Sequence, residues 1–150
     1  MNYPLSFNTW NKKEKKAIIE VVNSNHFTMG NRVKDFENKF AKKFNSKYAV
    51  MVNSGSSANL LIVSVLKYLE GIIKKKKIKN PNIIAPAIGW STSYFPITQA
   101  GYKINFVDVD FKTLNIDTIK LEKSIDKNTV GIMAINLLGN PCNFQHLKKL

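Results

Sequence analysis

The apolar residues of this chain recur with two different periods, which predict where helices and strands lie. In the first third, apolar positions fall at helical spacing with lysines on the opposite side. This pattern predicts helices over 11–24 and 33–44, joined by a loop over 25–30. Tyr48–Val52 is a short apolar run, which is typical of a buried strand.

After residue 52, strands and helices are expected to alternate. A turn of small residues covers 53–59 and leads into an apolar helix over 60–69. The expected strands are 83–85, 104–109 and 130–135, and the expected helices are 91–99, which Gly101 ends, and 118–124. This order indicates an α/β fold with a mainly parallel sheet and flanking helices. Ligands of such sheets bind at the carboxyl ends of strands, which points to the loops 53–57, 87–90 and 136–142.

Composition limits the class of protein. The 150 residues make about one domain, and 44% hydrophobic residues suffice for a core. No apolar run is long enough to span a membrane, and the N-terminus lacks the apolar stretch of a signal peptide. Cys142 is the single cysteine, which excludes an internal disulfide and offers no metal-ligand spacing. These features favour a cytoplasmic protein without a membrane partner.

The net charge of +13 raises the question of a nucleic-acid partner. Arg32 is the only arginine, however, whereas proteins that recognise DNA bases favour arginine. The densest basic run, Lys74–Lys77, follows an apolar helix, where lysines complement the helix dipole and face water. We therefore expect a solvated basic surface and no nucleic-acid partner.

Two loops carry candidate chemistry. Gly55, Ser56 and Ser57 stand at the start of a helix, where unpaired N–H groups and the helix dipole favour a phosphate. The alternative is that a serine there simply caps the helix. The turn matches neither a Walker A loop nor a GxGxxG turn. Trp90 follows the 83–85 strand, where its indole could stack on a planar ring or pack in the core. A phosphate cradle and an aromatic plate together suit a flat, phosphorylated cofactor.

Five segments in order resemble the DegT/DnrJ/EryC/StrS family of pyridoxal-phosphate-dependent sugar-nucleotide aminotransferases. The resemblance covers nearly the whole chain. The matching residues are 36–41, Tyr48-Ala-Val with Asn53-Ser-Gly-Ser-Ser-Ala-Asn-Leu, Ile84-Ala-Pro with Gly89-Trp-Ser-Thr, Phe106-Val-Asp-Val-Asp with Leu114-Asn-Ile-Asp, and Ile135-Asn-Leu-Leu-Gly-Asn-Pro.

The resemblance implies the fold, cofactor and site. The chain would be the N-terminal part of a type I aminotransferase large domain, truncated, with 1–30 as an N-terminal helix and loop and 31–150 as the start of that domain. Gly55, Ser56 and Ser57 would hold the phosphate of pyridoxal or pyridoxamine 5'-phosphate, and Trp90 would stack on its ring. The loop around His26–Gly30 resembles the segment near the substrate entrance.

The same resemblance implies what lies outside these residues. The family's aspartate for the pyridine nitrogen and its cofactor-linking lysine fall beyond the position of Leu150, so we expect no catalytic residue here and no activity from these residues alone. The complete enzyme is expected to be a homodimer acting on a nucleotide-linked keto-sugar in polysaccharide or lipopolysaccharide biosynthesis, with an amino donor such as glutamate.

Two branches of the family remain open as the function, and two other classes of protein are the alternatives. Leu138-Gly-Asn-Pro141 and the Asn53–Asn59 turn resemble the 3-dehydrases of 4-keto-6-deoxy sugars, in which a histidine replaces the lysine, more than the transaminases. A non-catalytic phosphate- or nucleotide-binding module and a nucleic-acid-binding protein are the alternatives of other classes. Asp108 and Asp110 are interpreted as strand-end structure, not metal ligands, and His26 and His146 as surface or packing residues.

Overall fold

The computed structural model describes residues 6–73 and 78–150, except for the side chains of 70–73. The predicted basic run Lys74–Lys77 lies outside these residues. The chain divides into two compact units, Met1–Met51 and Val52–Leu150. The expected division at residue 30 stays a prediction.

The first unit consists of two helices, α1 (Lys12–Asn23) and α2 (Asn31–Lys43), close to their predicted bounds. A capping box starts α1: Asn11 accepts from the N–H of Lys13, and Glu14 accepts from the N–H of Asn11 at 2.8 Å. Arg32 forms an ion pair with Glu20, which links the two helices.

Residues 48–52 do not form the strand that their apolar pattern predicted. They are in extended or irregular backbone, and Tyr48 and Val50 are exposed. A strand requires hydrogen bonds to a neighbouring strand, and none of the described residues pairs with this run. The N–H of Met51 donates instead to the side chain of Glu37 in α2, at Oε1 and 2.8 Å.

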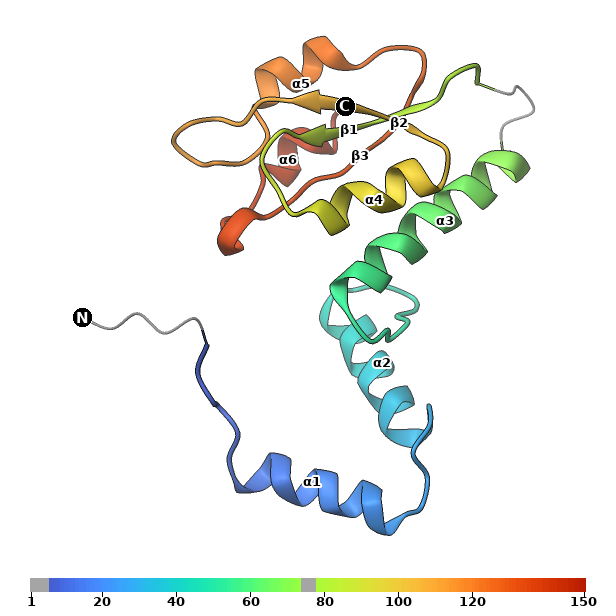
Figure 1. Cartoon of the computed structure of the whole chain (residues 1–150), viewed down its shortest axis with the longest axis vertical. Coiled ribbons are helices and arrows are strands. Elements are labelled where there is room, and N and C mark those ends of the chain that lie inside the picture. The colour runs from blue at the N-terminus through green and yellow to red at the C-terminus, as the bar shows by residue number, and fades with distance from the viewer. Residues whose placement is uncertain (1–5, 74–77) are drawn as a thin grey trace. The chain divides into compact units, whose positions relative to one another are not determined.

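The second unit is a parallel three-stranded sheet covered on both faces, which confirms the predicted fold class. Its strands are β1 (Asn82–Pro86), β2 (Lys103–Val107) and β3 (Thr129–Ile132), in the order β2-β1-β3. The helices are α3 (Gly55–Ile73), α4 (Ser91–Gln99), α5 (Thr118–Ser124) and α6 (Phe144–Leu147). Helix α4 lies on one face of the sheet and α5 on the other (Figure 1). No helix in the described segments is both long and apolar enough to cross a bilayer.

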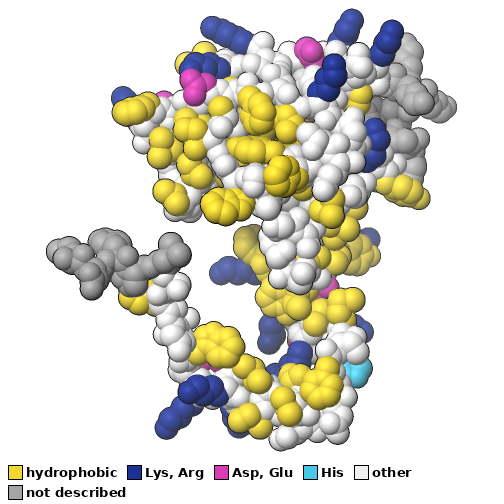
Figure 2. Space-filling view, in the orientation of Figure 1, with side chains coloured by type: hydrophobic (Ala, Val, Ile, Leu, Met, Phe, Trp, Pro, Cys, Tyr) yellow, Lys and Arg dark blue, Asp and Glu magenta, His cyan; other side chains and the backbone are white. Residues whose placement is uncertain are grey.

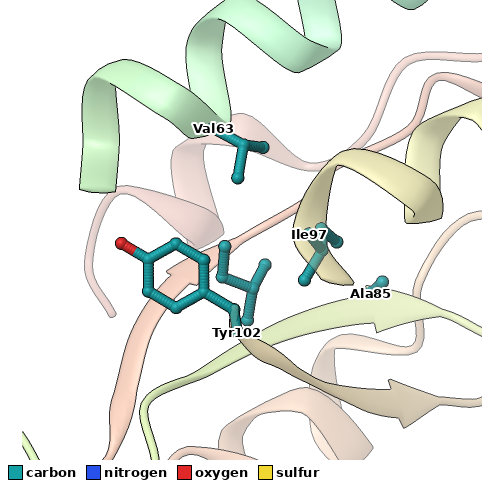
Figure 3. Packing of buried hydrophobic residues seen from close by; sticks show 5 residues of the cluster. Val63, Ala85, Ile97 and Tyr102 are labelled. Atoms are coloured by element: carbon teal, nitrogen blue, oxygen red, sulfur yellow. The ribbon is translucent and has the colours of Figure 1, made fainter. Parts of the chain in front are cut away.

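Alternate residues of β1 build two cores, because successive side chains of a strand point to opposite faces. Ile83 and Ala85 pack with Val63 of α3, Ile97 of α4 and Tyr102 (Figure 3). On the other face, Ile84 packs with three buried residues, namely Val107, Ile116 and Leu121. The central strand is therefore buried on both faces, as expected for a parallel sheet with flanking helices.

The end of α4 has the features of a Schellman motif. Gly101 has a φ of +79°, which favours glycine, and its N–H donates to Thr98 O at 2.9 Å. The N–H of Tyr102 donates to Ile97 O at 3.0 Å, and both side chains belong to the same core cluster. The turn therefore leads the chain directly from α4 into β2.

Candidate functional site

The first candidate loop opens α3, which begins at Gly55, within the turn 53–59 that was expected to precede the helix. Ser54 caps the helix, since its Oγ accepts from the N–H of Ser57 at 3.2 Å and its carbonyl accepts from the N–H of Ala58 at 3.1 Å. The hydroxyl of Ser57 donates to Asn53 Oδ1 at 2.6 Å. The capping role thus falls on Ser54, and the N–H groups of Gly55 and Ser56 have no acceptor within the helix.

The space around Gly55 fits an anion. A Cβ added to Gly55 would have no heavy atom within 4 Å, so packing within the chain does not require glycine there. Ser56 is exposed beside it. Two N–H groups at the start of a 19-residue helix, with open space in front of them, suit the phosphate of a cofactor.

Helices α3 and α4 line an open pocket of about 200 Å³ that begins at this turn. Its lining residues come from the first turns of both helices and from the α4 side that follows: Ser56, Ser57, Leu60, Thr92, Phe95, Pro96 and Gln99. Asn59 Nδ2 donates to Thr92 O at 3.5 Å across the same pair of helices. The structure therefore brings the first candidate loop beside helix α4, although neither Gly55 nor Trp90 lines this pocket.

Trp90 immediately precedes α4, in the second candidate loop. Its side chain is 74% exposed, so it is not the core tryptophan that was the alternative interpretation. Its carbonyl accepts from the N–H of Ser93 at 2.9 Å, which fixes the backbone at the start of the helix. The indole is free to contact a ligand at the carboxyl edge of the sheet.

Gly89 stands in a tightly packed turn beside Trp90. A Cβ at this position would overlap Tyr94 Oη and lie 2.9 Å from Ile135 Cδ1. The Tyr94 hydroxyl donates to Pro86 O at 2.9 Å, and burial raises the pKa of this phenol. The contact with Ile135 places the second loop against the start of the third.

We expect Gly89→Ala to destabilise the fold by about 1–3 kcal/mol, because the added methyl forces Tyr94 or Ile135 to move. Urea unfolding of the chain measures this change. Gly55→Ala is the matched control, since its methyl enters open space and should change stability by less than about 1 kcal/mol. Equal effects of the two substitutions would contradict the packing described for Gly89.

The third candidate loop follows β3 and contains a short 3-10 helix, Leu137–Gly139. Leu138 has a φ of 52° and is 94% exposed, an unusual combination for a large apolar residue. Asn136 Oδ1 accepts from the N–H of Cys142 at 2.9 Å, which closes the loop on itself. All three loops predicted from the sequence thus lie on the sheet-bearing unit, and Gly89 of the second lies against Ile135 at the start of the third.

The aspartates after β2 have structural contacts. Asp108 lies 2.9 Å from Lys120 Nζ, and this hydrogen bond is the main reason that its pKa is lowered. Asp110 caps a turn by accepting from the N–H of Thr113 at 2.9 Å, which lowers the pKa of this carboxyl as well. Across residues 6–73 and 78–150, no three side chains among His, Cys, Asp and Glu gather as a metal site.

The histidines also have neighbours that the sequence did not reveal. His146 Nε2 lies 2.9 Å from Glu122 Oε1, a contact between side chains that the sequence pattern did not reveal. His26 packs against Gly30 in a pocket of about 560 Å³ within the first unit, formed by the α1–α2 loop and the helix ends beside it. Lysine and arginine side chains stand at several separate places on the face in view rather than in one stripe (Figure 2).

Comparisons with known proteins agree with this geometry. The model of the DegT/DnrJ/EryC1/StrS aminotransferase family matches residues 8–150. The chain is 49% identical to a GDP-4-keto-6-deoxy-D-mannose 3-dehydratase of Yersinia pseudotuberculosis, over 100% of this chain and 37% of the relative. It is 30% identical to the GDP-perosamine synthase of Escherichia coli O157:H7, over 92% of this chain and 36% of that protein.

A solved structure shows the same fold. The E. coli GDP-4-keto-6-deoxy-D-mannose 3-dehydratase with bound hydrated pyridoxal phosphate is 49% identical and superposes with a TM-score of 0.88, over 99% of this chain and 37% of that one. The chain thus spans well under half the length of the relatives it matches.

Proposed function

Because the chain belongs to the DegT/DnrJ/EryC1/StrS aminotransferase family, we propose that it forms part of a pyridoxal-phosphate-dependent enzyme that modifies nucleotide-linked keto-sugars. Within the family we favour the 3-dehydratase branch. The observation that carries this choice is the 49% identity to a 3-dehydratase over the whole chain, compared with 30% to an amino-sugar synthase.

In this proposal the start of α3 binds the cofactor phosphate. The N–H groups of Gly55 and Ser56 donate to the phosphate at the positive end of the helix dipole. The exposed hydroxyl of Ser56 donates to the phosphate as well. Ser57 also belongs to the cradle, but its hydroxyl proton is already given to Asn53, so its oxygen stays fixed as part of the turn. Of the three predicted residues, Gly55 and Ser56 therefore have the groups that are free to bind.

Trp90 would cover one face of the cofactor ring. Its exposed indole offers an apolar plate, and the packed turn at Gly89 limits how far that plate can move. When bound, the cofactor supplies an electron sink for bond breaking at the sugar. The residues described here bind and orient it, and the group that moves the proton is expected in the remainder of the complete enzyme.

The partners follow from the same proposal. The substrate class is a nucleotide-linked 4-keto-6-deoxy sugar, as in the names of the 3-dehydratase relatives. The proposal also includes an amino donor such as glutamate, a homodimer with the active site at its interface, and a cytoplasmic location. These three points rest on the family resemblance. The pocket beside His26 is our candidate for the substrate entrance.

Two experiments test this function separately. The first determines the DNA sequence that follows the Leu150 codon. A continuing frame with histidine at the cofactor-linking position supports the 3-dehydratase, whereas lysine there supports a transaminase and contradicts our choice of branch.

The second experiment tests cofactor binding through a chimera in which residues 1–150 replace the matching segment of the E. coli relative. We expect the purified chimera to show the absorbance of bound pyridoxal phosphate. A folded, dimeric chimera that binds pyridoxal phosphate no more tightly than it binds pyridoxal, which lacks the phosphate, would contradict the phosphate site. A non-catalytic phosphate module would predict binding of inorganic phosphate without preference for the cofactor.

A further inference from the structure

Two asparagine side chains tie the third loop to the turn that follows β2. Asn115 Nδ2 donates to Pro141 O at 3.0 Å, and Asn140 Nδ2 donates to Thr113 O at 2.7 Å. Each bond joins a side chain on one segment to a backbone carbonyl on the other, so the two bonds run in opposite directions. We call this pair the amide clamp.

The turn that carries Asn115 is itself firmly built. Val109 and Ile116 form an antiparallel bridge, and the N–H of Asp110 donates to Asn115 O at 2.8 Å. Asn115 is only 6% exposed, although asparagine is a residue that usually lies at the surface. Burying this amide costs free energy unless its polar atoms make hydrogen bonds. Asn115 Oδ1 is buried without a partner among the described residues, so the bond from Nδ2 to Pro141 O is what offsets this cost and ties the side chain to the loop.

The loop needs such a constraint because its backbone is strained. Leu138 has a φ of 52° without glycine's freedom, and no core packing holds its side chain, which is 94% exposed. Strained residues of this kind persist only where the surrounding structure fixes them, and they are common at ligand sites. The amide clamp and the bond from Cys142 to Asn136 supply that fixation.

The clamped loop bears on the proposed cofactor site through Ile135. Cys142 Sγ donates to Ile135 O at 3.2 Å, and Ile135 Cδ1 lies against Gly89, the neighbour of Trp90. Because a methyl group would not fit between Gly89 and Ile135, a shift of the loop must move the Trp90 turn or open a gap beside it.

We propose that Asn115 and Asn140 are positioning residues: by fixing the third loop they hold Ile135 against Gly89, and so fix the Trp90 plate for the cofactor ring. This inference rests on the proposed function. The hydrogen bonds of both side chains go to Pro141 and Thr113 and not to the start of α3, so we expect the phosphate cradle to be independent of them.

The test replaces Asn115 by aspartate in the chimera described above. Asn115→Asp keeps the side-chain shape but removes the N–H donor and places an oxygen against Pro141 O. We expect hydrogen exchange of the Gly139, Asn140 and Cys142 amides to rise about 10-fold, the effect of losing one buried hydrogen bond. The Kd for pyridoxal phosphate, measured by absorbance titration, should rise about 5-fold to 10-fold.

Asn105→Asp is the matched control. Asn105 Nδ2 donates to Ser124 O at 3.2 Å in the same unit, so this variant also loses an amide-to-carbonyl bond, but away from the third loop. It should leave the loop exchange and the cofactor Kd unchanged, even where it lowers the melting temperature. A cofactor Kd that rises equally in both variants would show a general loss of stability and would overturn the inference.

Asn140→Ala provides a second route if Asn115→Asp does not fold. Asn140 is exposed, so its truncation leaves no cavity and removes only the bond to Thr113 O. The same rise in loop exchange and cofactor Kd is expected, and unchanged values of both would overturn the inference. Failure of the unsubstituted chimera to bind the cofactor would instead contradict the proposed function.

Discussion

Gly55→Asp should raise the Kd of the chimera for pyridoxal phosphate by at least about 100-fold while leaving the fold intact. Two negative groups about 4 Å apart at a protein surface repel by about 4 kcal/mol, and a loss of about 2.7 kcal/mol already weakens binding 100-fold. The fold should tolerate the change because a side chain at Gly55 enters open space. An aspartate in the first turn of α3 also complements the helix dipole, which stabilises by about 0.3–1 kcal/mol.

The measurement pairs absorbance titration with thermal unfolding of the same samples. Lys12→Asp is the control, since it places a carboxylate at the first residue of α1 and alters the net charge even more. It should bind the cofactor as the unsubstituted chimera does. Unweakened binding by Gly55→Asp would mean that the phosphate lies elsewhere, whatever the family resemblance implies.

Leu121→Ala should destabilise the 150-residue chain by about 2–5 kcal/mol. Leu121 of α5 is fully buried in the cluster around Ile84, and its truncation both loses apolar burial and leaves a cavity beneath the central strand. Single domains have a total stability of only about 5–15 kcal/mol, so such a loss should be visible as a large shift of the urea midpoint.

Ile119→Ala on the same helix is the control for Leu121→Ala. Ile119 is 66% exposed, so its truncation should cost less than about 1 kcal/mol and should change helix propensity in the same favourable direction. Similar midpoints for the two variants would contradict the packing of α5 against the sheet. Circular dichroism of both variants would show whether the helix itself persists.

Regular elements were predictable where a single segment contains its own signal. The bounds expected for α4 and α5 agree with the structure, because Gly101 marks the end of the first and Asp117 caps the start of the second. The short apolar segment 83–85 was correctly expected to be a strand, and it forms the centre of β1. The apolar run at 48–52 was wrongly predicted to be a strand. A strand also needs a neighbouring strand to bond to, and the apolar pattern does not reveal whether such a neighbour is present.

The candidate site was predictable as a set of loops but not as a set of contacts. The rule that ligands bind at the carboxyl ends of parallel strands selected the three loops, and the exposed Trp90 has the accessibility that a stacking role needs. Ser54 as the capping residue and the amide clamp were missed. The clamp joins side chains to carbonyls 26 and 27 residues away, and no local pattern encodes such a pairing.

The parallel order β2-β1-β3 also has a kinetic consequence. β1, α4 and β2 are consecutive, whereas β3 reaches β1 only after α5 and its turns have been made. A shorter connection loses less entropy on closure, so the β1–α4–β2 segment should form first, with β3 added later. In pulse-labelled hydrogen exchange during refolding, the amides that hydrogen-bond between β1 and β2 should then become protected first. The amide of Met133, which donates to Ile84 O, should become protected later. Simultaneous protection would indicate a single folding nucleus that includes β3.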